Sequence, residues 1–235
     1  MNEVVEIRRY PVKSMAGESV ESAVVDARGL VGDRWFAVTD SDGRLASGKD
    51  SRRFRRRDAV FAHAAQIVDG EVLVTGPRGV WPVGDPELDR ALSEQMGDEV
   101  HVLPESGTLH QDAGQVSLVG TASLDWCREH LEVDGDRRRI RPNIVVRTSE
   151  PFVEETWGGA RLQIGDVVLT VVERIERCRM VDVAQEGLDA QPGWLKALGR
   201  VRDLSLGMYA DVARAGSITR GDPVLVLSVK DFLSD

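Results

Sequence analysis

Cys178 has the surroundings that most suggest chemistry in this chain. It follows an apolar, β-branched run over residues 165–172, which predicts a strand covered on both faces, and it is flanked by Arg177 and Arg179. Cationic neighbours favour the thiolate, the form of cysteine that attacks electrophiles and ligates soft metals. The alternative is a buried, inert thiol, as free cysteines usually are. The pattern nominates Cys178 as a nucleophile or a metal ligand.

A second set of residues has the chemistry needed to bind an oxyanion. Lys13 and Ser14 occupy a loop after the first predicted strand, where an ammonium, a hydroxyl and free backbone amides could hold an anion. Arg34, Arg141 and Asn143 lie further along the chain. Because arginine binds phosphate through two parallel hydrogen bonds, the set could hold a phosphorylated cofactor. Ordinary polar turns and surface ion pairs are the alternatives.

Several other chemistries find little or no support in the sequence. The histidines are scattered without the spacing of a zinc protease, and the nucleotide-binding and serine-hydrolase glycine motifs are absent. A cysteine hydrolase pairing Cys178 with His110 stays open, because nucleophile and base need only meet in space. Cys127 and Cys178 are the only cysteines, which excludes a disulfide framework, a four-cysteine zinc site and a four-thiolate iron–sulfur cluster. We expect Cys127, on the apolar stripe of a predicted helix, to lie in the core.

Composition indicates a folded protein without broad affinity for polyanions. The 235 residues are 42% hydrophobic and carry a net charge of -9, which argues against nonspecific binding to nucleic acid or acidic membranes. No apolar run approaches the roughly 20 residues of a membrane helix, and no signal core precedes the first charges. We therefore expect a cytoplasmic protein. Arginine runs at residues 52–57 and 137–141 interrupt the acidic background, and the first is expected to be a solvated loop.

Predicted strands greatly outnumber predicted helices, which favours a mainly β fold over a doubly wound parallel sheet. A hairpin is expected at Asp69-Gly70. One helix should begin after Asp85 and stop at Gly97, a second should cover residues 121–131, and a short third should end at Gly199. The strands are expected at residues 4–10, 20–26, 34–40, 100–103, 144–147, 162–172 and 218–224. We place the boundary between two tightly associated halves, 1–100 and 101–235, near residue 100.

A series of short strings resembles the MOSC family, named for the C-terminal domain of molybdenum cofactor sulfurases and shared with the mitochondrial amidoxime-reducing components. The N-terminal part of the resemblance lies in YPVKSMAGES and GLVGDRWFAV. The C-terminal part lies in RRIRPNIVV, FVEETW, IGDVVL, ERC and SITRGDPV. Their order and spacing extend the resemblance over almost the whole chain.

The resemblance implies a β-barrel MOSC core, preceded by a smaller and mostly β N-terminal domain, with a few short helices. It also implies a molybdenum pyranopterin cofactor between the two, with Cys178 as metal ligand and catalytic residue. No iron–sulfur cluster is expected in this chain. The positions that match the family's cofactor-binding residues are Lys13, Ser14, Arg34, Ser123, Arg141, Asn143 and Arg177.

By this resemblance the chain would be an oxidoreductase that reduces N-hydroxylated small molecules. Two alternatives remain open: a non-catalytic sulfur or cofactor carrier that also uses Cys178, and a metal-free, cysteine-dependent transferase. A reductase would need a separate electron-transfer protein of ferredoxin or cytochrome type, for which residues 52–57 offer a docking surface. Met15 and the segment after Cys178, RMVDVAQEG, depart from the family pattern, which leaves the substrate and any role of Asp182 open.

Overall fold

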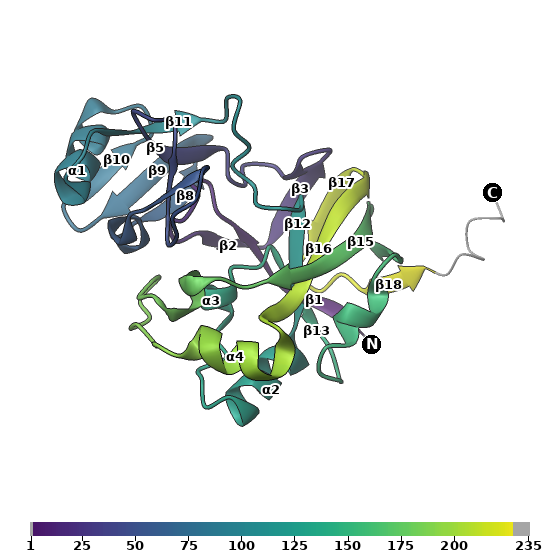
Figure 1. Ribbon diagram of the computed structural model, residues 1–235. Coiled ribbons are helices and arrows are strands. Elements are labelled where there is room, and N and C mark those ends of the chain that lie inside the picture. The colour runs from purple at the N-terminus through teal and green to yellow at the C-terminus, as the bar shows by residue number, and fades with distance from the viewer. Residues whose placement is uncertain (1, 228–235) are drawn as a thin grey trace.

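An eight-stranded, curled sheet forms the larger lobe of the molecule (Figure 1). The computed structural model describes residues 2–227, and within it the strands of this sheet run in the order β18 (Val224–Leu227), β14 (Arg161–Ile164), β15 (Val167–Glu176), β16 (Ser205–Arg214), β12 (Val116–Gly120), β13 (Ile144–Arg147), β1 (Glu3–Arg9) and β2 (Glu18–Val20). Val4 N donates to Asp222 O at 2.9 Å and Gly221 N donates to Val4 O at 2.8 Å, so β1 meets the turn before β18. The mainly β fold with a barrel-like core is confirmed.

Long apolar side chains fill the inside of the curled sheet. Ile7, Leu118, Leu162 and Leu169 come from four different strands, and each is completely buried in one cluster. A small sheet of β17 (Gly216–Thr219), β3 (Ser22–Asp26) and β4 (Gly29–Leu30) packs beside it through Ile218. Strand β3 alternates between buried and exposed residues, so one face of this small sheet packs against the core while the other faces solvent.

The smaller lobe has its own core and two sheets. One sheet orders β11 (Val100–Pro104), β5 (Phe36–Asp40), β6 (Leu45–Ser47) and β7 (Phe54–Arg56), and the other orders β10 (Gly79–Pro82), β9 (Glu71–Gly76) and β8 (Ala64–Val68). Helix α1 (Pro86–Met96) and the 3-10 helix η1 (Asp58–Ala62) cover them, and Leu88, Leu92, Val60 and Phe61 join their shared core.

Local turn and cap chemistry acts as predicted in this lobe. Asp69 and Gly70 both have positive φ, at 51° and 86°, in the hairpin between β8 and β9. The Asp85 carboxylate accepts from Glu87 N at 2.9 Å at the start of α1, and Gly97 ends the helix in the left-handed conformation. Both features were predicted, and both are confirmed.

A third core cluster lies under the helices of the larger lobe. Helices α2 (Thr121–His130), α3 (Arg137–Ile140) and α4 (Trp194–Arg202) and the 3-10 helices η2 (Val153–Trp157) and η3 (Arg179–Asp182) belong to this region. Cys127 is completely buried in the cluster with Trp194 and Leu198, which confirms its predicted core position. Helix α4 does not stop at Gly199 as predicted but continues to Arg202. Trp194 and Leu198 anchor it in the core, and Gly199 lies within the helix, close to the Leu204 side chain that follows it.

Strand pairing does not separate the chain into two parts at residue 100. Strand β1 pairs with β13, and β3 pairs with β17, so the first 30 residues largely belong to the sheets of the larger lobe. The chain begins in that lobe, crosses to the smaller one and returns through β12. The predicted separation into residues 1–100 and 101–235 therefore differs from the pairing of the strands.

The first arginine run is more structured than the solvated loop that was expected. Residues 54–56 form strand β7, and Arg57 is buried, 3.4 Å from an Asp40 carboxylate oxygen and 2.5 Å from an Asp98 carboxylate oxygen. Arg55 lies 3.1 Å from Asp40 as well. Within residues 2–227, no helix is long and apolar enough to cross a membrane.

We predict that Gly207, the glycine of β16, cannot be replaced by a larger residue without a large loss of stability. Its φ is +80°, and a Cβ there would lie 2.6 Å from Leu118 O and 3.0 Å from an Arg177 guanidinium nitrogen. Gly221 has a similar φ of +91° but open space around it. We expect Gly221→Ala to lower the free energy of unfolding by about 1–2 kcal/mol through backbone strain alone. Gly207→Ala should cost clearly more, measured by urea denaturation, and equal losses would contradict a steric role.

Candidate functional site

The buried ring of Tyr10 gathers three arginines from separate segments. The guanidinium carbons of Arg8, Arg34 and Arg141 lie 5.6, 4.9 and 4.3 Å from the ring centroid. The Tyr10 hydroxyl accepts from Arg8 Nε at 3.0 Å and donates to Pro142 O at 3.3 Å. Burial raises the pKa of Tyr10, so the ring stays neutral. A neutral aromatic face attracts cations, and Tyr10 thereby fixes Arg34 and Arg141 side by side.

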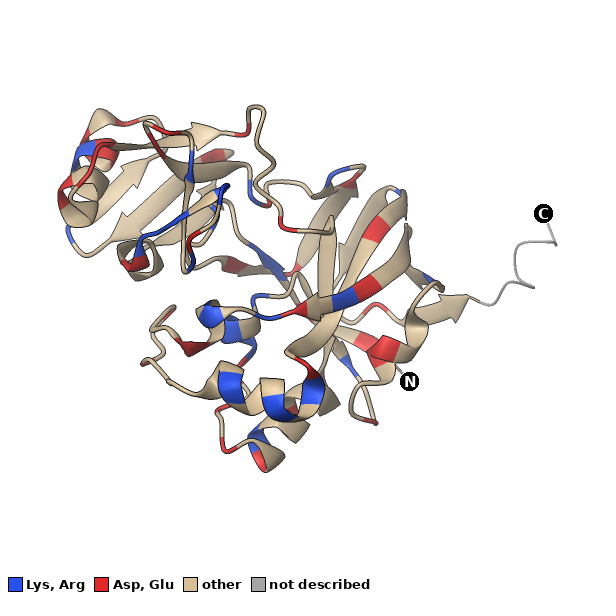
Figure 2. Ribbon diagram, viewed as in Figure 1, with Lys and Arg blue, Asp and Glu red and all other residues tan. Residues whose placement is uncertain are grey.

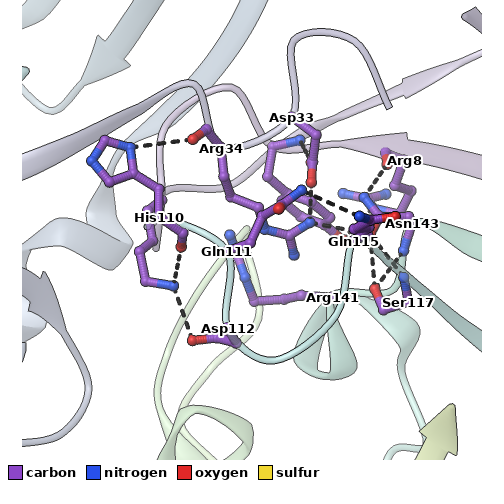
Figure 3. Close-up of polar contacts among 12 residues, drawn as sticks. Arg8, Asp33, Arg34, His110, Gln111, Asp112, Gln115, Ser117, Arg141 and Asn143 are labelled. Atoms are coloured by element: carbon purple, nitrogen blue, oxygen red, sulfur yellow. Dashed lines mark hydrogen bonds and ion pairs between the residues drawn. The ribbon is translucent and has the colours of Figure 1, made fainter. Parts of the chain in front are cut away.

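A hydrogen-bonded network holds Arg34 beside Asn143 (Figure 3). Arg34 forms an ion pair with Asp33, and one of its Nη atoms lies 3.2 Å from Asn143 Oδ1. The same oxygen accepts from the Ser117 hydroxyl at 2.9 Å and from Ser117 N at 3.1 Å. Burial opposes the charge of Arg34, but the Asp33 carboxylate outweighs it and the pKa of Arg34 is raised. The network therefore links the smaller lobe's entry loop to β12 and the start of β13.

Three of the predicted site residues adopt the left-handed backbone conformation. The φ values of Ser14, Arg34 and Arg141 are 69°, 50° and 54°. Such a conformation costs a non-glycine residue on the order of 1–2 kcal/mol, and it persists where surrounding contacts determine it. For Arg34 and Arg141 those contacts are the Tyr10 ring and the Asn143 network, so the fold tolerates backbone strain to aim these two side chains.

The residues around Tyr10 form one wall of a cavity of about 560 Å³, which we call the Cys178 cavity. Arg34, Arg141, Asn143, Arg177 and Cys178, all predicted as site residues, line it together. Figure 2 shows basic residues gathered where the two lobes meet, around α3. Other lining residues that could contact a ligand are Lys49, Arg53, Asp112, Ser117, Met180 and Tyr209. Three arginines that are distant in the sequence, Arg34, Arg141 and Arg177, therefore line one cavity with an amide and a thiol.

Arg141 is the lining residue best suited to receive an anion. One of its terminal nitrogens donates to Met15 O at 2.6 Å, whereas the other is buried without a hydrogen-bond partner among residues 2–227. Burial lowers the pKa of Arg141, and no carboxylate among residues 2–227 forms an ion pair with it. A buried donor without a partner costs about 1–3 kcal/mol, and an anionic ligand would satisfy it. The residues present therefore fit a phosphate group.

Lys13 lies behind the cavity wall and is coupled to it through Asp112. The Lys13 ammonium donates to His110 O at 2.6 Å and to Asp112 Oδ1 at 3.0 Å. Burial lowers the pKa of Lys13 to about 8. Burial opposes the Asp112 carboxylate too, but the Lys13 charge prevails and lowers the pKa of Asp112 to about 2. Asp112 lines the cavity, so Lys13 influences a ligand there mainly through its charge.

Cys178 stands where β15 leaves the sheet. The pairing of β15 with β16 shifts register between Val171 and Glu176, and Cys178 then caps η3 with its side chain partly exposed. Arg177 donates to the backbone carbonyls of Leu206 and Ile140, and burial lowers its pKa to about 10. Among the described residues neither Arg177 nor Arg179 donates a hydrogen bond to the thiol. Arg177 braces the cavity floor, and Cys178 provides its one thiol.

Arg179 turns away from the cavity that its neighbour lines. Its two terminal nitrogens donate to the two carboxylate oxygens of Asp58 at 2.8 and 2.6 Å. Asp58 begins η1 in the smaller lobe, so this ion pair bridges the lobes. Arg179 donates its hydrogen bonds to Asp58 and none to the thiol, so its charge acts on Cys178 only through space.

Two predicted hydroxyls do not reach the cavity. Ser14 is buried and donates to Ala46 O at 2.9 Å. Ser123 is completely buried, donates to Glu154 Oε1 at 2.7 Å and accepts from Phe152 N at 2.7 Å, so it fastens α2 to η2. The serine that lines the cavity is Ser117, on β12 before this helix. Sequence reasoning missed Ser117 and Tyr10, and the only available signals were a polar residue within an apolar strand and an aromatic residue before a proline.

His110 offers little to a hydrolase built on Cys178. Its Nδ1 lies 3.2 Å from Arg34 O, its side chain is buried, and it is not among the described residues that line the cavity. Burial lowers the pKa of His110, so the imidazole is neutral at pH 7. Residues 2–227 also contain no group of three or more His, Cys, Asp or Glu side chains arranged to hold a metal ion.

Comparison with known proteins matches both halves of the chain to one family. Residues 105–225 match the MOSC domain, and residues 1–132 match the MOSC N-terminal beta barrel domain. The chain belongs to the MOSC domain family. The resemblance recognised in its motifs is thereby confirmed.

MOSC relatives are found among two kinds of named protein. A molybdenum cofactor sulfurase of Oryza sativa subsp. japonica is 23% identical over 75% of this chain, and mitochondrial amidoxime reducing component 2 of Rattus norvegicus is 31% identical over 49% of it. The chain spans only 28% and 37% of those two proteins. Mitochondrial amidoxime-reducing component 1 of Mus musculus is 24% identical over 93% of this chain and 80% of its own length.

A solved structure supports the fold independently of these sequences. The YUAD protein from Bacillus subtilis superposes with a TM-score of 0.52 and 14% sequence identity, covering 95% of this chain and 94% of that one. At this identity the likeness concerns the fold alone.

Removing the Arg141 guanidinium should weaken anion binding in the Cys178 cavity. We expect Arg141→Met to lower the affinity for phenyl phosphate by about ten- to a hundredfold, because a charge-assisted hydrogen bond and its cation are lost. Titration calorimetry measures the change. Arg128→Gln, which removes an exposed arginine on α2 paired with Asp125, is the matched control and should bind normally. Equal affinity in Arg141→Met and the wild type would place the anion elsewhere.

Anion affinity should also fall as the pH rises through the pKa of Lys13. This pKa is depressed to about 8, so the ammonium is present below that pH and lost above it. Between about pH 7.5 and 9 phenyl phosphate stays a dianion, and Arg177, whose pKa is about 10, stays largely protonated, so neither contributes a trend. We expect Cys178→Ser, a variant without the thiol, to bind phenyl phosphate more tightly at pH 7.5 than at pH 9. Lys13→Met in that background should bind weakly at both values, and a persistent pH trend in it would rule out Lys13 as the source.

Proposed function

We propose that the cavity lined by Cys178 and Arg141 binds a molybdenum pyranopterin cofactor, with Cys178 as the protein ligand of the metal. The observation that carries the proposal is the presence of an accessible thiol and an unpartnered buried guanidinium donor in the same cavity. A thiolate suits a soft metal centre, and arginine suits the phosphate of a pterin. Arg34, Asn143 and the charge of Lys13 would assist Arg141, and Arg177 would keep the segment that carries Cys178 in place.

The proposed reaction is the reduction of N-hydroxylated small molecules. When bound, the cofactor supplies two-electron redox chemistry at its metal. The overall change breaks the N–O bond of a hydroxylamine-type substrate, consumes two electrons and two protons, and gives an amine and water. The protein would contribute the hydrogen-bond donors that bind the cofactor phosphate and, in Cys178, a thiolate ligand for the metal. The relatives named amidoxime-reducing components support this reaction, although they are distant in sequence.

The electrons would come from a separate electron-transfer protein of ferredoxin or cytochrome type. An acidic donor protein could dock near the arginine run of the smaller lobe, where opposite charge speeds encounter. Arg55 and Arg57 already pair with Asp40 and Asp98, and Arg56 pairs with Asp58. Among residues 2–227, the exposed cation of this surface without an ion pair is Arg52. Docking there would be weak and sensitive to salt.

A sulfur or cofactor carrier is the second candidate function. Relatives named molybdenum cofactor sulfurases align with most of this chain, and a partly exposed thiol is what a persulfide carrier requires. A metal-free transferase needs the same thiol but no cofactor. The three functions share Cys178 and differ in what is attached to it.

One experiment separates the three functions. Holoprotein from a host that makes the cofactor should contain about one molybdenum per chain, and Cys178→Ser should lose most of it, because a soft thiolate ligand is replaced by a harder hydroxyl. Reduced with a chemical donor, the wild type should convert members of a panel of hydroxylamines and amidoximes. NADH or NADPH alone should sustain no turnover, since electrons must come through a partner.

The other outcomes assign the other functions. Persulfide on Cys178 without turnover indicates the carrier, and activity in metal-free protein indicates the transferase. Equal molybdenum in the wild type and Cys178→Ser would remove Cys178 from the metal site. Sustained turnover with a nicotinamide nucleotide alone would overturn the need for a separate donor.

A further inference from the structure

A second and larger cavity, of about 1160 Å³, lies between the smaller lobe and the segment that follows Cys178. We call it the Gln185 cavity. One wall comes from η1 and β8, through residues such as Phe61 and Ala64, and the other comes from residues 182–193. Figure 1 shows this second segment between η3 and α4, below the smaller lobe. The segment begins with DVAQEG, the last six residues of the RMVDVAQEG string that departs from the family pattern.

The two cavities share η3 as a wall. Cys178, Met180 and Val181 line the Cys178 cavity, whereas Arg179 and Asp182 line the Gln185 cavity. The short turn of a 3-10 helix sends neighbouring side chains to different sides. The Gln185 cavity is therefore a separate space and not an extension of the site described above.

Two buried acceptors in the Gln185 cavity have no partner. Gln185 is 3% exposed, its amide nitrogen donates to Met180 O at 2.5 Å, and its Oε1 has no hydrogen-bond partner among residues 2–227. Glu186 pairs through Oε1 with Arg8, and its buried Oε2 is likewise without a partner in that range. Burying a polar atom without a partner is unfavourable, and a ligand that donates hydrogen bonds would recover that cost.

The other residues that line the Gln185 cavity favour a ligand with a positively charged hydrogen-bond donor and an apolar body. Asp58, Asp182 and Glu186 contribute three carboxylates. Arg179 pairs with Asp58 and Arg8 pairs with Glu186, which leaves Asp182 as the carboxylate of this cavity without an ion pair among residues 2–227. His63 also lines the cavity, and burial lowers its pKa, so it adds no positive charge at pH 7. Much of the other surface is apolar, from Phe61, Pro77, Val183, Leu188 and Pro192.

We propose that the Gln185 cavity binds a small organic amine, with the apolar body against Phe61 and Leu188 and the ammonium donating to Gln185 Oε1 and Glu186 Oε2. Mostly apolar cavities with a few converging polar atoms are the usual form of small-molecule sites. The two acceptors stand next to each other in the chain, and a single ammonium has enough donors for both. This site does not depend on the cofactor proposal, because none of these residues lines the Cys178 cavity.

The test uses the purified full chain and 1-naphthylmethylamine as the probe, followed by titration calorimetry. We expect one site, with 1-naphthoate, the matched anion, binding at least tenfold more weakly. Gln185→Leu keeps the size of the side chain but removes the acceptor, and it should weaken the amine at least tenfold. Because this change also removes the hydrogen bond to Met180 O, Ala190→Trp serves as a second variant. It obstructs the cavity from an exposed lining position without touching that bond.

Cys178→Ser is the control for the other cavity and should bind the amine normally. Loss of amine binding in Cys178→Ser, or unchanged binding in both Gln185→Leu and Ala190→Trp, would overturn the proposed site. Equal binding of the amine and the carboxylate would show that only the apolar ring is recognised, which also contradicts the proposal. Failure of molybdenum binding would leave these results unaffected.

Discussion

The packing of three guanidinium groups around the buried Tyr10 ring is the interaction on which the Cys178 cavity depends. Cations gathered in a desolvated space repel one another, and few carboxylates are near enough to balance them. Asp33 neutralises Arg34, and Glu6 and Glu186 pair with Arg8. Within the described part of the chain, Arg141 contacts only the ring and a carbonyl. Each cation–π contact is worth about 0.5–2 kcal/mol, which is less than burying an unpaired charge costs. The fold therefore holds an unmatched positive charge that an anion would relieve.

Features that depend on residues close together in the sequence could be predicted from it, and features that depend on residues far apart could not. The Asp69-Gly70 hairpin and the capped helix α1 depend on neighbouring residues, and both could be predicted. The pairing of β1 with β13 joins residues more than a hundred positions apart, and no local signal indicates it. The same limit explains the choice of Ser123 over Ser117. Ser123 opens a recognisable helix, whereas Ser117 reaches the cavity only because β12 lies between β13 and β16.

The chemistry of Cys178 shows the difference between neighbours in sequence and neighbours in space. Arg177 and Arg179 flank the cysteine in the chain, yet one donates to backbone carbonyls and the other pairs with Asp58. What the sequence captured correctly is the position of the thiol just after a buried strand. What it could not capture is the register shift of β15 against β16, which turns Cys178 toward the cations gathered by Tyr10.

The short helix η3 lines both cavities, so the contacts that hold this helix in position fix a wall of each. Its Arg179 ties it to Asp58 in the smaller lobe, while Val181 anchors it in the core under α4. The ion pair is partly exposed on both sides, and pairs of this kind contribute only about 0.2–1 kcal/mol, so the apolar anchor must hold the helix in position. A small movement of the lobes would then strain the Arg179 contact before it displaced Val181. The Asp58 side of the Gln185 cavity would change shape first, and the wall that carries Cys178 would change last.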